Sequence, residues 1–168
     1  MKTFNSIREA FRPKHGDVFH ITTENNFENI IHSGRILPPF NVDKVYTNFG
    51  DYAAELSKGR VHFSGDPDHW IYNLEENELR LAIFMMKPSR VNSYKFKTTN
   101  QILHRKYPDL NTDNLYKNIE LSLDFFTTKP VPLKDLYVFN FREKSFVDIN
   151  RDINIDDYLR YPMDIPQL

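Results

Sequence analysis

The chain has 168 residues, of which 40% are hydrophobic and 27% are charged, and its formal net charge is −1. This length and composition fit one folded domain and exclude a globally disordered chain. The near-neutral charge gives no bulk attraction to nucleic acid or to a membrane surface, although a local basic groove stays open, and the lack of cysteine excludes disulfides, thiolate nucleophiles and zinc–thiolate sites.

Neither a targeting signal nor a membrane span is expected. Residues 1–13 carry several charges and lack the apolar run of a secretory signal. The most apolar stretch, Leu79–Met86, contains Arg80 and is far shorter than the roughly 20 residues that a spanning helix needs. We therefore expect a cytoplasmic protein with no membrane partner.

The first elements are a strand and a helix behind an N-terminal extension, residues 1–16. Asp17–Thr22 alternates in a way that predicts a strand. In the helix that follows, Asn25 can cap the start, and Glu28 stands three residues later, as in a capping box. Gly34 suits the left-handed residue that ends many helices.

The middle of the chain predicts shorter elements. Lys44–Asn48 predicts a second strand, Asp51–Ser57 a short helix, and residues 64–78 an exposed polar loop. Leu79–Met86 is apolar enough to be a central strand. Residues 87–115 are mixed, with short helices expected at Asn100–Lys106 and near Thr112–Tyr116.

The last third carries the clearest strand pattern. Asn118–Thr127 alternates with a period of two, which is typical of a strand with one core face. Its opposite face carries Glu120, Ser122, Asp124 and Phe126. Leu136–Phe141 predicts a further strand, and residues 142–168 a C-terminal helix and tail. Because strands outnumber helices and do not alternate regularly with them, the expected class is α+β, in one domain (residues 1–168) with its core at 17–141.

Two histidines and two acids lie close together after Gly59. His62, Asp66, Asp68 and His69 could hold a metal ion, which would suit a hydrolase or nuclease. Metal ligands usually stand on rigid elements, however, and this segment has the composition of a loop. A solvated acidic loop is the preferred interpretation, and no metal is expected. The chain also lacks the P-loop, the Gly-rich dinucleotide fingerprint, HExxH and GxSxG.

Three blocks of residues resemble a known family. Phe19-His20-Ile21-Thr22, with Asn26-Phe27, Ile30-Ile31, Gly34 and Leu37-Pro38 after it, resembles the opening of the ADP-ribosyltransferase fold, and is especially similar to the DarT-like branch, which modifies DNA bases. Lys44-Val45-Tyr46-Thr47-Asn48, followed by Tyr52, is similar to the strand and helix that carry the Tyr of the His–Tyr–Glu clade.

The third block contains the catalytic position. Family members commonly place a catalytic Glu eight residues before the Pro of an Ile/Val-Pro-Leu turn, and counting back from Pro132 gives Asp124 instead. The resemblance thus covers about residues 17–140 and departs from the family at its acid. Motif position favours Asp124 as the functional acid, whereas reach favours Glu120 on the same strand face, because Asp is one methylene shorter.

The resemblance implies a split, mainly antiparallel sheet with short flanking helices around a cleft for NAD, which serves as co-substrate. His20, Tyr46 and the face of Glu120 and Asp124 should converge on that cleft. The cofactor contacts it implies are His20, Ile21, Thr22, Asn26, Tyr46 and Tyr52. Tyr46 would stack on the nicotinamide ring.

The implied activity is NAD-dependent ADP-ribosyl transfer to a macromolecule, either nucleic acid or protein. The small size of the chain suits a bacterial or phage toxin or effector, with an antitoxin or immunity protein as a partner. Two alternatives remain: an ADP-ribosyltransferase-like binding or regulatory module that has lost catalysis, as Asp124 at the Glu position suggests, and the metal-dependent hydrolase described above.

Overall fold

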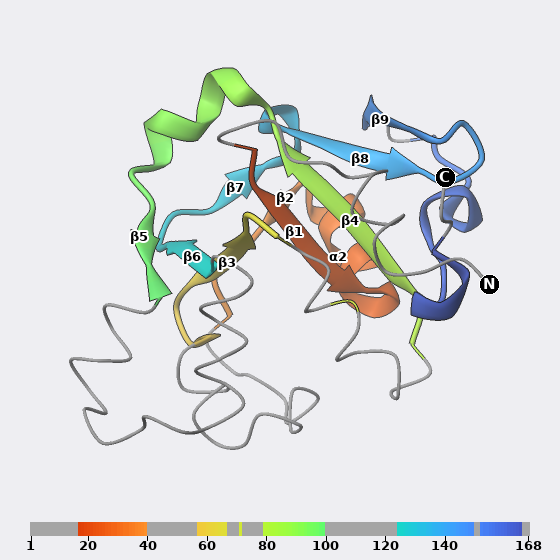
Figure 1. Ribbon diagram of the computed structural model, residues 1–168, viewed down its shortest axis with the longest axis horizontal. Coiled ribbons are helices and arrows are strands. Elements are labelled where there is room, and N and C mark those ends of the chain that lie inside the picture. Colours follow the sequence, from red (N-terminus) through yellow and green to blue (C-terminus); the bar gives the residue numbers. More distant parts are fainter. Residues whose placement is uncertain are drawn as a thin grey trace.

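A seven-stranded sheet organises the described part of the chain. The computed structural model describes residues 17–39, 57–66, 71, 79–99, 124–149 and 152–165. The strand order is β5-β6-β3-β1-β4-β8-β9, and all neighbours pair antiparallel (Figure 1). The strands are β1 (Phe19–Thr23), β3 (Val61–Ser64), β4 (Leu81–Met86), β5 (Lys97–Thr98), β6 (Asp124–Thr127), β8 (Leu136–Asn140) and β9 (Ser145–Asp148). This arrangement confirms the predicted α+β class.

The remaining elements are short. A second sheet pairs β2 (Arg35–Ile36) with β7 (Val131–Pro132). The 3-10 helices are η3 (Pro88–Tyr94), η4 (Leu133–Asp135), η5 (Ile155–Tyr158) and η6 (Pro162–Asp164). No helix within the described ranges is long and apolar enough to cross a membrane.

Helix α2 (Glu24–Ser33) follows β1 directly and lies behind the sheet in Figure 1. It ends at Gly34, which has φ 77°, so the predicted stop is confirmed. The predicted cap at Asn25 is wrong, because Thr23 is the N-cap and makes no side-chain capping bond. A tertiary contact fixes the start instead: the backbone N–H of Glu24 donates to the carbonyl of Arg80, and the Arg80 guanidinium donates to the Glu24 carboxylate.

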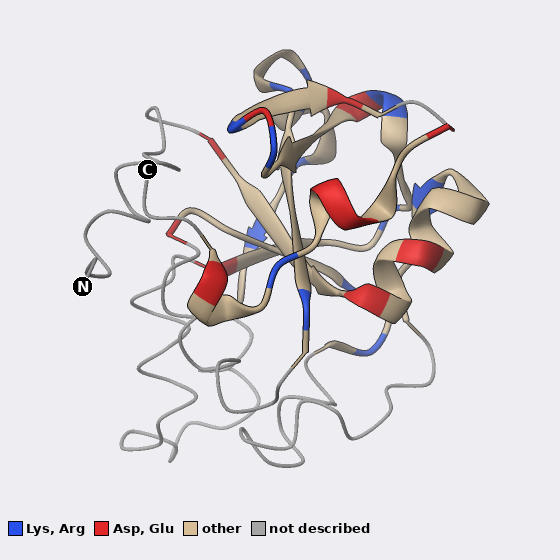
Figure 2. Cartoon of the chain, turned by 90° about the vertical axis from the view of Figure 1, so that its right-hand side faces the viewer, with Lys and Arg blue, Asp and Glu red and all other residues tan. Residues whose placement is uncertain are grey.

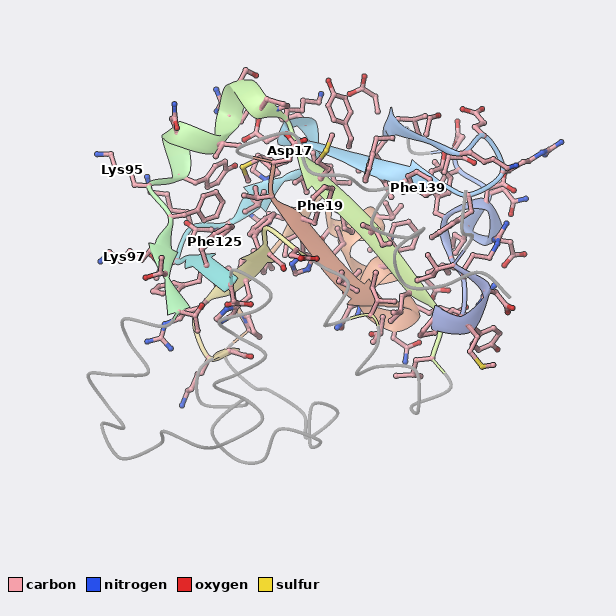
Figure 3. The ribbon with its side chains drawn as sticks, in the orientation of Figure 1. Asp17, Phe19, Lys95, Lys97, Phe125 and Phe139 are labelled. Atoms are coloured by element: carbon pink, nitrogen blue, oxygen red, sulfur yellow. The ribbon has the colours of Figure 1, made fainter. Side chains whose placement is uncertain are left out.

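Apolar side chains cover both faces of the sheet. The larger cluster joins Phe27 and Ile30 of α2 to Phe63 and Phe84 on the sheet, so α2 covers that face. The smaller cluster lies on the opposite face, over β1, β4 and β8; its buried residues are Phe19, Ile71, Leu81, Ile83, Phe139, Phe141 and Ile165. Figure 3 labels Phe19 and Phe139 of this second cluster.

The ladder between β1 and β3 is short. All five residues of β1 pair with β4, whereas Phe19 with Ser64 is the one pair in register between β1 and β3. In Figure 1, β3, β6 and β5 lie on one side of β1, and β4 and β8 lie on the other. The ladder is thus broken at the β1–β3 junction.

Charged residues are spread over the fold. Figure 2 shows Lys and Arg interspersed with Asp and Glu over the described elements, without a large patch of one sign in that view. At the edge of the sheet, Lys95 and Lys97 point away from the fold beside β5 (Figure 3). Lysines at an exposed edge discourage pairing with another chain.

The predicted strands at Asp17–Thr22, Leu79–Met86 and Leu136–Phe141 correspond to β1, β4 and β8. Five of the described strands were not predicted: β3 and β9, and the two-residue strands β2, β5 and β7. The prediction of one core face at the end of Asn118–Thr127 is wrong, because Phe126 on the other face is only 3% exposed. The predicted strand at Lys44–Asn48, residues 51–56 of the predicted helix, the two short helices predicted at residues 100–106 and 112–116, and most of loop 64–78 lie outside the described residues. The prediction of an exposed loop is wrong at Ser64, which ends β3 and is 3% exposed, and at Ile71, which is 1% exposed.

Candidate functional site

Polar side chains gather on one face of β3 and β6. Ser64 pairs with Asp124 across the two strands, and paired residues share a face of a sheet. His62 stands two residues before Ser64, so alternation places it on the same face. This is the face that carries the smaller apolar cluster over β1, β4 and β8, because Phe19 is the partner of Ser64 on β1. Beyond the β1–β3 junction the face therefore carries the polar side chains of His62, Ser64 and Asp124 beside the buried ring of Phe126.

Asp124 is the centre of this polar group. Its Oδ1 atom lies 2.7 Å from Nδ1 of His62 and accepts a second hydrogen bond from the hydroxyl of Thr99. The Thr99 oxygen also lies 3.3 Å from the same Nδ1. The side chain of Asp124 is 6% exposed and that of His62 is 22% exposed. A buried carboxylate thus holds a partly exposed imidazole.

His20 meets the same segment through the backbone. Its Nδ1 atom lies 2.7 Å from the carbonyl oxygen of His62. A carbonyl only accepts, so Nδ1 of His20 carries the hydrogen and Nε2 of the neutral ring is an acceptor. Burial lowers the pKa of His20 from 6.5 to about 4, although the hydrogen bond to His62 and the Asp124 charge oppose this shift. His20 is therefore neutral at pH 7.

Residue 62 connects the first and third blocks of the sequence resemblance. By alternation His20 belongs to the face that α2 covers, and its ring contacts Phe63 and Phe84. Asp124 lies on the other face. His20 contacts the backbone of His62 and Asp124 contacts its side chain. The two predicted residues therefore both contact His62 at the break in the β1–β3 ladder, but from opposite faces of the sheet, so the described residues do not show the expected convergence of the His20 and Asp124 side chains on one cleft.

The other predicted cofactor residues are distributed as follows. Ile21 is half-buried against the smaller apolar cluster, whereas Thr22 is 3% exposed on the α2 side. Asn26 is exposed in the first turns of α2. Three further predicted site residues lie outside the described residues: Tyr46, Tyr52 and Glu120.

The proposed metal ligands do not gather in the described ranges. No group of three His, Cys, Asp or Glu side chains there is placed to hold a metal ion. The interpretation of His62 as part of a loop is wrong, since it stands on β3 with its Nδ1 against Asp124. Asp68 and His69 lie outside the described residues.

His62 and Thr99 are the site residues that the sequence interpretation missed. The alternation Val61-His62-Phe63-Ser64 after Gly59 was the available signal for β3, because it combines β-branched and aromatic residues with a period of two. Thr99, which directly follows β5, has no comparable signal, since its proximity to Asp124 depends on the pairing of β5 with β6.

No protein-family model, curated protein or solved structure matches this chain. The chemistry of the site therefore rests on its own groups: a buried carboxylate, a neutral imidazole acceptor at His20 and an oriented imidazole at His62. A carboxylate can stabilise a developing cation, and an oriented imidazole can take a proton. Such a combination suits group transfer through a cationic transition state.

Proposed function

We propose that the protein is an NAD-dependent ADP-ribosyltransferase that modifies a macromolecule. The observation that carries the proposal is the connection of His20 and Asp124 through His62. These two residues occupy the His and acid positions of the family resemblance and are far apart in the sequence. Each contacts His62 from its own face of the sheet, at the junction where the β1–β3 ladder stops, and we infer that NAD binds along this junction.

The carboxylate of Asp124 suits the chemistry of NAD cleavage. Departure of nicotinamide leaves positive charge on the ribose C1′ and ring oxygen, as in glycoside hydrolysis. Both side-chain hydrogen bonds to Asp124 reach Oδ1, and among the described residues Oδ2 accepts none. We assign Oδ2 to the 2′-hydroxyl of that ribose, where its negative charge stabilises the transition state.

The neutral state of His20 suits a sugar-binding role. Its Nε2 lone pair can accept a hydrogen bond from a ribose hydroxyl, and the bond from Nδ1 to the carbonyl of His62 keeps the ring in one orientation. The low pKa, about 4, preserves this acceptor across the physiological pH range. We assign the backbone groups of Ile21, which is half-buried beside the junction, to ligand binding as well.

One observation favours a second candidate, an NAD-binding module without catalysis. Asp124 is one methylene shorter than the Glu of the family, and its side chain is 6% exposed. Displacement of a catalytic group by about 1 Å can reduce the rate about 10²-fold. A binding module and an enzyme differ in NAD cleavage and share NAD binding.

The experiment measures binding and cleavage separately. NAD should raise the melting temperature, because a ligand that binds only the folded state stabilises it. His20→Ala should lose most of this shift, whereas His32→Ala, a change of an exposed histidine on α2, should keep it. Nicotinamide release should fall about 10²–10³-fold in Asp124→Asn with NAD binding retained. Glu120→Gln should have a milder effect.

The outcomes separate the candidates. A melting temperature that does not respond to millimolar NAD would count against both the transferase and the binding module. Binding without nicotinamide release would favour the module. Loss of turnover in Glu120→Gln but not in Asp124→Asn would transfer the acid role to Glu120. Labelled NAD added to a cell lysate, followed by separate protease and nuclease digestion, identifies the acceptor as protein or nucleic acid.

A further inference from the structure

The pair formed by His62 and Asp124 has the form of an acid-oriented base. Nδ1 of His62 lies 2.7 Å from Oδ1 of Asp124. Because a carboxylate accepts, Nδ1 carries the hydrogen, and the basic lone pair of the neutral ring is on Nε2, on the other side of the imidazole. The carboxylate is the buried member and the imidazole is the partly exposed one. An Asp that holds a His in this way fixes its tautomer and stabilises the imidazolium that proton uptake creates.

Neighbouring groups restrict the ring further. The ring centroids of His62 and Phe126 lie 5.9 Å apart, and the Arg60 guanidinium lies 5.2 Å from the Phe126 centroid. The Thr99 hydroxyl lies beside Nδ1. Of the charged and titratable residues, Asp124 contacts the imidazole of His62, His20 contacts the His62 backbone carbonyl, and Arg60 lies over the neighbouring Phe126 ring. His20 is neutral at pH 7, and the Asp124 carboxylate is in direct contact with the imidazole.

We propose that His62 is the general base that takes the proton from the acceptor, and that the acceptor is a neutral nucleophile with a proton to lose. Water, a hydroxyl group and an N–H group of a nucleobase belong to this class; carboxylate, thiolate and phosphate anions do not. The inference rests on the proposed transferase function and specifies its second reactant.

The reaction balances with these groups. The acceptor oxygen or nitrogen forms a bond to C1′, while the glycosidic bond breaks and its electron pair leaves with nicotinamide, which becomes neutral. The proton of the acceptor passes to Nε2 of His62. Asp124 serves both partners: Oδ1 holds the base, and Oδ2 faces the ribose. The imidazolium then releases its proton to water.

The matched test removes the base and keeps the contact with Asp124. In His62→Asn the side-chain amide N–H can replace the Nδ1–H donor, but no basic lone pair remains. The control is His32→Asn on the exposed side of α2. Nicotinamide release from NAD is measured in buffer alone, where water is the acceptor, and with sodium azide, and the ADP-ribosyl product is identified by mass spectrometry.

Azide distinguishes a base from a structural residue, because it is an anion with no proton to lose. His62→Asn should lose about 10²–10⁴-fold in the water reaction, the usual contribution of general base catalysis. The NAD-induced rise in melting temperature should remain. Azide should restore turnover to His62→Asn and yield ADP-ribosyl azide. Azide should not restore Asp124→Asn, in which stabilisation of the cation is lost.

Each outcome decides between the claims. A wild-type protein that releases no nicotinamide would overturn the proposed function, and this inference with it. An active wild type with an equally active His62→Asn would overturn the base role alone. An inactive His62→Asn that azide does not restore would show a structural role and overturn the inference. If the Asn variant fails to fold, His62→Gln is measured in the same two reactions.

Discussion

Acid should destabilise this fold through His20 more than through an ordinary histidine, and His20→Asn isolates the effect. The Asn amide can still donate to the carbonyl of His62 but does not titrate. Burial lowers the pKa of His20 from 6.5 to about 4, so between these values the unfolded chain binds a proton that the folded chain excludes. Stability is then complete above pH 6.5 and falls as the pH approaches 4. At about 1.36 kcal/mol per pH unit, the wild type should lose about 3 kcal/mol more than His20→Asn between pH 7 and pH 4.

Urea unfolding followed by circular dichroism gives the free energy of unfolding of both proteins across this pH range. The carboxylates and the other histidines titrate in both proteins, so their contributions largely cancel in the difference. Parallel stability curves for wild type and His20→Asn would refute the burial of a neutral His20. A variant that is more sensitive to acid than the wild type would refute the sign of the pKa shift.

Two further changes test the frame around the site by urea unfolding. Gly34→Ala should lower the free energy of unfolding by about 1–2 kcal/mol, because Gly34 has φ 77°. Nothing lies within 4 Å of an added Cβ, so the cost is conformational. An unchanged stability would contradict the left-handed conformation that ends α2. Tyr94→Phe should lower the free energy of unfolding by about 1–3 kcal/mol, because the Tyr94 hydroxyl donates to Oδ2 of buried Asp135 at 2.5 Å. An unchanged stability would mean that Arg90, 3.1 Å from Oδ1, is sufficient to satisfy this carboxylate.

Local patterns predicted the elements whose signals are themselves local. β4 is an apolar run, and Gly34 ends α2 because it adopts a left-handed conformation. β9 was not predicted because the turn between β8 and β9 carries no Gly. Lys144 takes φ 58° there, and the side chain of Asn140 accepts from the backbone N–H groups of Arg142 and Glu143. An Asx turn of this kind was the available signal, within a segment that otherwise has the composition of a charged tail.

The site illustrates the same division. The position of Asp124 followed from the turn after it, which is local. Its partner His62 could not be predicted in this way, because their proximity depends on the register that sets Ser64 opposite Asp124. Register is a property of two strands that are distant in the sequence. A four-residue strand such as β3 carries too few residues for its alternation to stand out from a neighbouring loop.

The Asp at position 124 and the His at position 62 are best understood together. Asp124 is the first residue of β6, and its short side chain keeps the carboxylate close to the sheet, where Nδ1 of His62 and the hydroxyl of Thr99 both reach Oδ1. A Glu would extend the carboxylate by one bond, roughly 1.5 Å, and so past these two donors. In a site that needs only a carboxylate beside the ribose, the shorter Asp side chain would be a disadvantage. In a site where the carboxylate must also hold a base, the shorter side chain is the one that serves both tasks.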